Sequence, residues 1–252
     1  MEVLVVGAGS MGRWLGQVFV ADVGPSLPAT ARDECTVTYY DRSNAAATQA
    51  AKATGGHTVT SVTQEYDVVA IAVPISAAPT AIASHAGNAT CAVVDVTGTM
   101  KKPVEALRSN ASAVERCSLH PLFAPPNEPG NVPVVTDKDG PVTTFIQETL
   151  EARGNNVFET TPEEHDSAMK TVQASAHAAI MAYSLAGESV PDRFQTAVSK
   201  ELSALVEQVG GNEPSVYGEI QAAFEGAEDV AAAANKLAVA SESEFEQLYD
   251  KI

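Results

Sequence analysis

The stretch Val5-Val6-Gly7-Ala8-Gly9-Ser10-Met11-Gly12 decides the fold, because it sets three glycines in the spacing G-x-G-x-x-G directly after an apolar strand. Gly7 permits the tight turn, and Gly9 lets a pyrophosphate approach the backbone. Gly12 lets the following helix pack closely on the strand. The stretch predicts a dinucleotide-binding domain at the start of the chain.

The neighbouring residues extend this prediction to a cofactor. The helix that begins at Ser10 and Met11 offers unpaired N–H groups and partial positive charge to phosphates. The next strand ends in Asp41, which can accept hydrogen bonds from the two ribose hydroxyls and so favours NAD over NADP, although Arg42 beside it suits a 2′-phosphate. A loop insertion at 24–28 explains the long interval before Asp41. The expected cofactor-binding set is Gly7, Gly9, Ser10, Met11, Gly12, Asp41, Arg42, Val73 and Pro74.

Apolar runs rich in β-branched residues alternate with alanine-rich segments over residues 1–160, whereas residues 161–252 contain no convincing strand. Continuous apolar strands indicate a parallel sheet covered on both faces. We therefore predict an α/β fold, with a Rossmann-type, doubly wound, mostly parallel sheet over 1–160 and an all-α domain for substrate and dimerisation over 161–252. The expected strands are 2–6, 36–40, 57–60, 68–73, 91–96, 115–119, 132–136 and 156–159; the expected helices are 11–20, 44–53, 77–85, 103–109, 163–185, 194–209, 214–223 and 227–249.

The composition narrows the functional classes. The 252 residues carry a formal net charge of −17, which disfavours binding to nucleic acid or to anionic membranes. Together with few lysines and many alanines, this charge predicts adaptation to a high-salt cytoplasm. Three cysteines without metal-ligand spacing predict no metal site and no disulfide framework. With no signal peptide or membrane span in the pattern, we expect a cytoplasmic protein.

Two polar stretches follow predicted strands, where ligands bind in open α/β sheets. The first holds Thr99 and Lys101, and the second is His120-Pro121-Leu122-Phe123-Ala124-Pro125. A third group lies on a predicted helix, where residues 165, 169, 173 and 177 recur every four positions on one face. A histidine near a cofactor crevice suits proton transfer near neutral pH.

These stretches resemble the prephenate dehydrogenase family. The run 120–125 looks like that family's H-P-M-F-G-P, Glu164-His165-Asp166 with Gln173 and His177 looks like its H-D…Q-x-x-x-H helix, and 212–217 looks like its D-P-x-x-Y turn. The resemblance implies oxidative decarboxylation of prephenate with NAD in tyrosine biosynthesis, a small-molecule substrate and a homodimer. It implies that His120 binds the ring hydroxyl and accepts its proton, that Thr99 replaces a serine near that hydroxyl, and that Gln173 and His177 face the substrate.

One departure from the family concerns the substrate carboxylate. The family usually carries an arginine a few residues before the D-P turn, and this sequence has Gln208 there. A carboxylate left unpaired in a partly dry site costs several kcal/mol, on the order of 2–7 for a polar group. We expect Arg193 to supply the missing cation, because its planar fork suits a carboxylate, with Lys200 as second choice.

Three alternatives remain open at this point. The substrate can be arogenate, the amino analogue of prephenate. The chain can be an oxidoreductase like the β-hydroxyacid dehydrogenases, with Lys170 as catalytic lysine, which leaves the His120-Pro121 loop unexplained. It can also be a dinucleotide-sensing module without turnover, which the polar groups after two strands disfavour. We expect His165 to cap or orient its helix.

Overall fold

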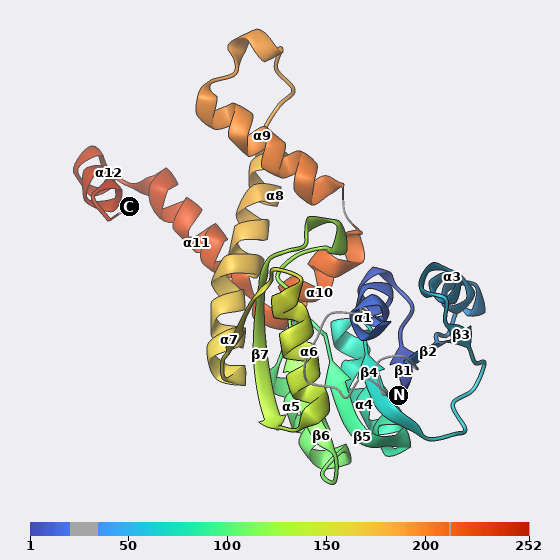
Figure 1. Cartoon of the computed structure of the whole chain (residues 1–252). Helices are drawn as coiled ribbons and strands as arrows, with labels where there is room; N and C mark the ends of the chain where they lie inside the picture. The colour runs from blue at the N-terminus through green and yellow to red at the C-terminus, as the bar shows by residue number, and fades with distance from the viewer. Residues whose placement is uncertain (21–34, 212, 252) are drawn as a thin grey trace. The chain divides into compact units, whose positions relative to one another are not determined.

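The computed structural model describes residues 1–20, 35–211 and 213–251 (Figure 1). The predicted insertion at 24–28 lies outside these residues. The chain divides into two compact units, Met1–Asp166 (unit 1) and Ser167–Ile252 (unit 2), each with its own internal packing. Among the described residues no helix is long and apolar enough to cross a membrane, and no cluster of His, Cys, Asp or Glu has the arrangement of a metal site.

Unit 1 is built on an eight-stranded sheet in the order β3-β2-β1-β4-β5-β6-β7-β8. All pairs from β3 to β6 are parallel, β7 runs antiparallel to β6, and β8 is parallel to β7. This confirms the mostly parallel, Rossmann-type sheet. The strands are β1 Glu2–Val6, β2 Thr36–Tyr40, β3 His57–Thr58, β4 Tyr66–Ile71, β5 Ala89–Asp95, β6 Glu115–Leu119, β7 Asn131–Lys138 and β8 Asn156–Glu159.

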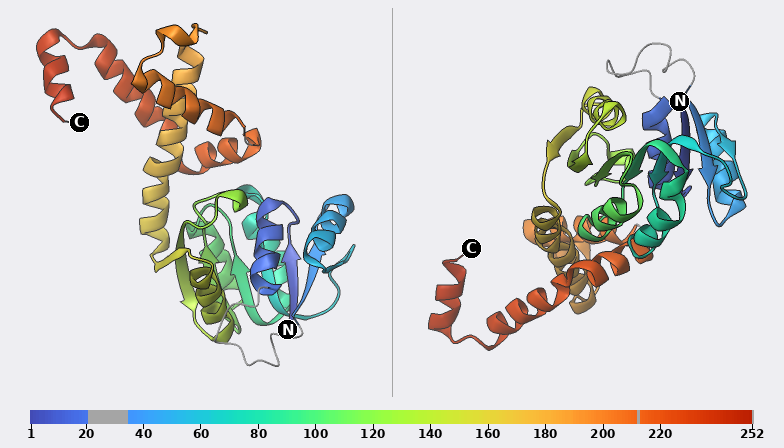
Figure 2. Two further views of the ribbon diagram at one scale, coloured as in Figure 1. Left: turned by 45° about the horizontal axis from the view of Figure 1, so that its top comes forward. Right: turned by 90° about the horizontal axis from the view of Figure 1, so that it is seen from below.

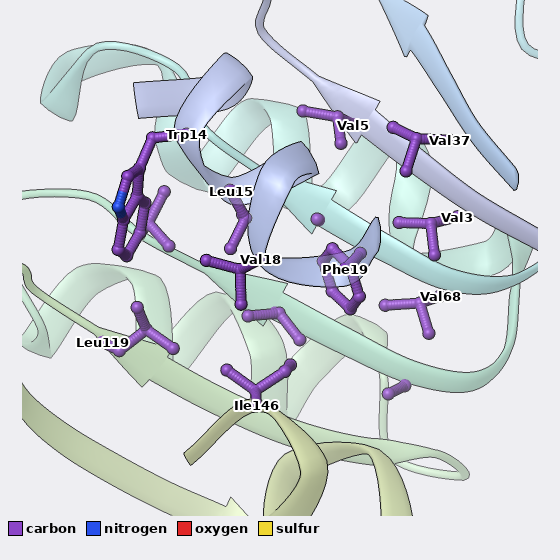
Figure 3. Packing of buried hydrophobic residues seen from close by; sticks show 14 of the residues in the cluster. Val3, Val5, Trp14, Leu15, Val18, Phe19, Val37, Val68, Leu119 and Ile146 are labelled. Carbon is purple, nitrogen blue, oxygen red and sulfur yellow. The ribbon is translucent and has the colours of Figure 1, made fainter. Parts of the chain in front are cut away.

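Helices cover both faces of this sheet, as Figures 1 and 2 show. On one face, apolar side chains of α1, α3 and α6 join those of the strands in a single buried cluster, with Trp14, Leu15, Val18 and Phe19 of α1 at its centre (Figure 3). On the other face, Ile82 of α4 and Leu107 of α5 pack with the strands in a second cluster. Two buried clusters are what a doubly wound sheet requires. The helices are α1 Ser10–Val20, α3 Asn44–Thr54, α4 Ala78–His85, α5 Lys101–Asn110 and α6 Pro141–Ala152.

Strand β7 aligns two distant parts of unit 1. Because it is reversed, its first half lies beside the end of β6, and the backbone N–H of His120 donates to Pro133 O at 3.0 Å. The next carbonyl, Val134 O, accepts from the N–H of Thr160 just after β8, at 2.9 Å. The residue after β6 and the residue after β8 are therefore fixed to adjacent peptide groups.

Unit 2 is helical, with a helical stretch that begins in unit 1 and runs from α7 Pro162–Met169 through a π-helical turn, Lys170–Ser175, into α8 Ala176–Ala186. The π turn is held by later helices: Gln221 donates its side-chain N–H to Ala174 O at 2.7 Å, and Gly226 packs against Ser175 and Ala174 with no room for a Cβ. The remaining helices are α9 Ala197–Gly210, α10 Pro214–Phe224, α11 Gly226–Val239 and α12 Glu242–Tyr249.

Several sequence predictions about unit 2 need correction. The helix expected over 163–185 contains the π turn, which inserts a wider turn and breaks the spacing of four that the polar stripe assumed. The helix expected over 227–249 is two helices, because Ala240 is extended and Ser241 opens α12 with a capping box to Glu244. In unit 1, helix α6 was missed altogether, although its buried residues recur at helical spacing.

Candidate functional site

The glycine loop has the geometry expected of a phosphate cradle. Gly7 adopts φ +99°, and a Cβ there would lie 2.2 Å from Ala72 O. A Cβ at Gly12 would lie 1.9 Å from Gly7 O, so the start of α1 packs against the turn itself. A Cβ at Gly9 would meet nothing within 4 Å, so the loop is open at that residue. An open backbone at the N-terminus of a helix is what a pyrophosphate needs.

Asp41 lies at the end of β2 and is bonded to the glycine loop. Its Oδ2 accepts from the Ala8 N–H at 2.8 Å, and its Oδ1 accepts from the Ser43 N–H at 2.7 Å. The carboxylate therefore fixes the loop, and each oxygen retains a further lone pair for a ribose hydroxyl. Arg42 beside it is exposed.

The other expected cofactor residues surround this loop. Ser10 is exposed and Met11 is half-buried at the start of α1. Val73 follows β4 and borders Gly7, since a Cβ on Gly7 would lie 3.1 Å from Val73 Cγ1. Pro74 comes next and is exposed. The structure thus brings the expected cofactor-binding residues to the carboxyl ends of β1, β2 and β4, where they fit a dinucleotide.

The expected chemical residues lie at the ends of the next two strands. β5 and β6 are neighbouring parallel strands, so their carboxyl ends meet at one edge of the sheet. His120 follows β6 and is 8% exposed, and Thr99 follows β5 and is 6% exposed. A Cβ built on Gly98 would lie 3.5 Å from His120 Nε2, which places this ring edge beside the loop that carries Thr99. The Thr99 Oγ1 is buried without a hydrogen-bond partner among the described residues, so it suits a ligand.

His120 is held by a partner that the sequence did not reveal. Its Nδ1 lies 3.0 Å from Nε2 of His165, and Nδ1 of His165 lies 2.8 Å from Oδ1 of Asp166. The pKa of His120 is lowered to about 3, first by burial and then by the neighbouring His165, while Asp166 opposes both effects. The ring is therefore neutral near pH 7 and can accept a proton. The H-D pair was visible in the sequence, but only the fold shows that it faces His120.

A buried acid beneath the same edge was also missed. Asp95, the last residue of β5, is fully buried, and its Oδ2 accepts hydrogen bonds from the hydroxyls of Thr97 and Ser118, both at 2.9 Å. Burial raises the pKa of Asp95 to about 7, although these hydrogen bonds lower it. A single acid at the end of an apolar strand gives no pattern from which this environment could be predicted.

The residues expected to bind substrate from the helical part belong to unit 2. Gln173 lies in the π turn, and the ring of His177 in α8 meets Tyr217 of α10 edge to face, with centroids 4.8 Å apart. Burial lowers the pKa of His177, so this ring too is neutral. A pocket of about 310 Å³ in the same unit is lined by Met181, Val209, Gly210, Pro214, Tyr217, Gly218 and Gln221.

The expected cations of unit 2 lie apart from each other in the chain. Arg193 is in a short 3₁₀ turn, Asp192–Phe194, with its guanidinium 4.9 Å from the Phe194 ring centroid. Lys200 is inside α9, which begins at Ala197, so the two cations lie in different elements. Lys170, the residue of the rival mechanism, pairs with Asp229 at 2.8 Å on the surface of unit 2.

Residues 29–131 match the family model of the prephenate dehydrogenase nucleotide-binding domain. This part of the chain is similar to the prephenate dehydrogenases. The 4-amino-4-deoxyprephenate dehydrogenase of Streptomyces pristinaespiralis is 29% identical to the chain in an alignment 243 residues long that covers 89% of this chain and 78% of that protein. This confirms the resemblance to the prephenate dehydrogenases that the sequence motifs indicate.

Solved structures show the same fold. The prephenate dehydrogenase from A. aeolicus, in complex with hydroxyphenyl propionate and NAD+, has a TM-score of 0.72 at 18% identity, covering 99% of this chain and 95% of that one. The arogenate dehydrogenase of Synechocystis has a TM-score of 0.62 at 16% identity, covering 100% and 97%. The comparisons therefore support an oxidoreductase of this family with a Rossmann-type domain followed by helices.

Proposed function

We propose that this protein catalyses the oxidative decarboxylation of prephenate to 4-hydroxyphenylpyruvate with NAD. The observation that carries the proposal is the position of His120, a buried and neutral histidine beside the Thr99 loop at the carboxyl edge of the sheet. The same edge carries the phosphate cradle, as hydride transfer from a bound substrate requires. This placement of His120 and Thr99 supports the proposed reaction.

In this proposal His120 accepts the proton of the substrate's ring hydroxyl as the carbonyl forms. The Thr99 Oγ1, buried and without a described partner, orients that hydroxyl. A bound oxidised nicotinamide dinucleotide, held at the cradle of Gly7, Gly9 and Gly12, would supply the acceptor for the hydride on the carbon that carries the hydroxyl. Loss of CO₂ would then make the ring aromatic, and the phenolate oxygen would take back the proton held by His120. Of these steps the protein supplies the positioned base, worth typically about 10²–10⁴-fold in rate, and the geometry that brings the groups together.

The cofactor preference rests on Asp41. Its carboxylate lies at the end of β2, bonded to the Ala8 N–H, where it would repel a 2′-phosphate and accept from a free ribose diol. We therefore expect kcat/KM to be higher with NAD+ than with NADP+. A preference for NADP+ would refute this role of Asp41 and indicate that Arg42 binds the 2′-phosphate.

A second candidate substrate is 4-amino-4-deoxyprephenate, because the relative from Streptomyces pristinaespiralis is named for it and aligns over 89% of this chain. A neutral histidine that accepts a proton fits an amino group as well as a hydroxyl. The test is one assay at molar salt that crosses prephenate, arogenate and 4-amino-4-deoxyprephenate with NAD+ and NADP+. We expect prephenate with NAD+ to have the highest kcat/KM. Turnover of none of the three would refute the proposed function.

We propose that side chains of unit 2 bind the substrate carboxylates. His177 Nδ1 is buried and has no hydrogen-bond partner among the described residues, which favours a contact with substrate, and Gln173 precedes it by four residues. Arg193 is proposed as the cation in place of the family arginine, with Lys200 as the alternative. Arg193→Ala or Lys200→Ala should raise the KM for prephenate; if neither does, the carboxylate is held elsewhere.

The rival mechanism with Lys170 is tested on the same assay. Lys170 is exposed and paired with Asp229, which favours a structural role at the surface. Activity should survive Lys170→Ala and be lost in His120→Ala. The opposite result would favour a β-hydroxyacid-dehydrogenase-like reaction.

We further propose that residues 1–160 bind the cofactor and that 161–252 serve substrate binding and pairing into a homodimer. Large apolar side chains are exposed on the helices of unit 2, which favours an oligomer. They include Leu185 (88% exposed), Val198 (70%), Val239 (73%) and Tyr249 (67%). Light scattering at molar salt should give twice the chain mass, and a monomer at micromolar concentration would refute the homodimer.

A further inference from the structure

A continuous chain of hydrogen bonds leads from His120 to a helix N-terminus within unit 1. Asp166 accepts from the N–H of Met100 at 2.9 Å and from that of Lys101 at 3.2 Å, at the start of α5. The same carboxylate lies 2.8 Å from His165 Nδ1, and His165 Nε2 lies 3.0 Å from His120 Nδ1. His165 is 2% exposed, so its ring has little water to bond instead.

The carboxylate sets the direction of every bond in this chain. Burial raises the pKa of Asp166, but hydrogen bonds from His165 and from the Met100 and Lys101 N–H groups outweigh it, so the pKa lies below its ordinary value and the group is ionised. An ionised carboxylate only accepts, so His165 must carry its proton on Nδ1. With that one proton on its ring, His165 accepts at Nε2, and His120 donates from Nδ1.

We propose that His165 and Asp166 are positioning residues that hold His120 in the Nδ1–H tautomer, so that its Nε2 is the proton acceptor of the reaction. The tautomer follows from this chain of hydrogen bonds with Asp166 ionised and one proton on the His165 ring, whereas the use of Nε2 in catalysis rests on the proposed function.

The ring edge that this tautomer exposes is the one beside the loop after β5. The virtual Cβ of Gly98 is 3.5 Å from His120 Nε2, and Thr99 follows directly. Asp166 also holds Met100, the next residue, through its N–H. One carboxylate therefore fixes both the histidine chain and the loop that faces the accepting nitrogen.

The charges near His120 explain why this arrangement helps a base. The titratable groups around it are His165 and Asp166 from α7, and Asp95 of β5, which bonds Ser118 two residues before His120. Burial makes His120 hard to protonate, which weakens it as a base. Asp166 counteracts this, because positive charge on either imidazole is stabilised by the carboxylate at the end of the chain.

Four variants separate this role from a structural one. His165→Gln keeps an acceptor for the His120 N–H without an imidazole ring, and His165→Leu removes the acceptor. Asp166→Asn keeps an oxygen for His165 and Met100 but removes the charge. Glu164→Gln is the matched control, since it neutralises an exposed carboxylate of the same helix that bonds Thr160 rather than His165.

The first measurement is ¹⁵N NMR of the histidine rings in the full chain without substrate. The wild type, His165→Gln and Glu164→Gln should show His120 protonated at Nδ1 only, and His165→Leu should show a mixture of tautomers. A wild-type His120 protonated at Nε2 would overturn the proposal, whatever the enzyme's activity.

The second measurement is the pH dependence of kcat and KM. His165→Leu should lower kcat about 10–100-fold with little change in KM, as for other partners that orient a histidine, and His165→Gln should recover most of that loss. Asp166→Asn should move the acid limb of kcat/KM to lower pH, because the imidazolium loses its counter-charge, and Glu164→Gln should not move it.

The outcomes distinguish the two proposals. Unchanged kcat and pH profile in His165→Leu and Asp166→Asn would overturn the positioning role while leaving the proposed reaction intact. If the wild type turns over none of the three substrates but the NMR result holds, the proposed function and the catalytic use of Nε2 fail together, and only the tautomer remains. If His165→Leu does not fold, the pH profiles of His165→Gln and Asp166→Asn decide.

Discussion

Replacement of Asp95 by asparagine should stabilise the protein at alkaline pH and have little effect in acid. Asp95 is fully buried, with Oδ2 bonded to Thr97 and Ser118 and with no hydrogen-bond partner on Oδ1 among the described residues. Burial raises its pKa from 3.8 to about 7. An asparagine oxygen at the Oδ2 position would accept the same hydrogen bonds, and the amide carries no charge to bury.

The magnitude follows from proton linkage. Because the folded pKa lies above the unfolded one, the folded state binds the proton more tightly, and the contribution of Asp95 is most favourable below pH 3.8. That contribution is lost as the pH rises through about 7. A shift of about 3 pK units at 1.36 kcal/mol per unit gives a loss of about 4 kcal/mol.

The assay is urea unfolding of wild type and Asp95→Asn between pH 4 and pH 8.5 at constant molar salt. The difference in the free energy of unfolding should be small near pH 4 and grow by up to about 4 kcal/mol toward pH 8.5 in favour of the variant. Asp139→Asn, at an exposed position, is the control and should differ from wild type by less than about 0.5 kcal/mol throughout. If the difference in the free energy of unfolding between wild type and Asp95→Asn does not change with pH, Asp95 is not buried as an isolated acid.

Three further predictions concern the base, the packing of α1 and the net charge. His120→Asn should lower kcat by about 10²–10⁴ without loss of cofactor affinity by fluorescence titration; lost cofactor binding would make His120 structural. Gly16→Ala should lower the free energy of unfolding in urea by about 1–3 kcal/mol, because its Cβ would lie 1.9 Å from Tyr39 Oη. The control Gly87→Ala, whose Cβ would meet nothing within 4 Å, should lower it by less than about 1 kcal/mol. Equal losses in the two variants would contradict the packing of α1. Lowering salt from molar to about 0.1 M should lower the melting temperature, because at a net charge of −17 self-repulsion grows as the Debye length rises from ~3 to ~10 Å; a salt-independent Tm would remove the high-salt interpretation.

The sheet could be predicted from the sequence because its strands are continuous apolar runs between turn residues. Glu2–Val6, Thr36–Tyr40 and Glu115–Leu119 are strands with the bounds that the pattern indicated. Helix α6 carried a readable signal as well, with Pro141 at its first position and buried residues at helical spacing, and it was overlooked. Local sequence patterns are therefore sufficient to predict most of the strands and helices of unit 1.

The remaining features depend on contacts between distant residues. The π turn at Lys170–Ser175 is stabilised by Gln221 and Gly226, some fifty residues later, and no local pattern announces it. The sequence predicts only a helix-orienting role for His165, because it cannot show that His165 Nε2 lies 3.0 Å from His120 Nδ1. The burial of Asp95 likewise depends on how the neighbouring strands and helices pack around it.

Two adjacent carbonyls of β7 link the arrangement of His120 and His165 to the stability of the sheet edge. Pro133 holds His120, and Val134 holds Thr160, which leads into the helix of His165. Strand β8, between them in sequence, has four residues and is the last strand of the sheet. Short edge segments open with less free energy than the central strands.

When β8 opens, Thr160 loses its anchor while His120 keeps its own, so the two imidazoles separate before the sheet unfolds. The amide of Thr160 should then exchange its hydrogen faster than that of His120. Heat should also reduce activity at a temperature below the midpoint of global unfolding, since the competent arrangement of the two rings has an opening equilibrium of its own.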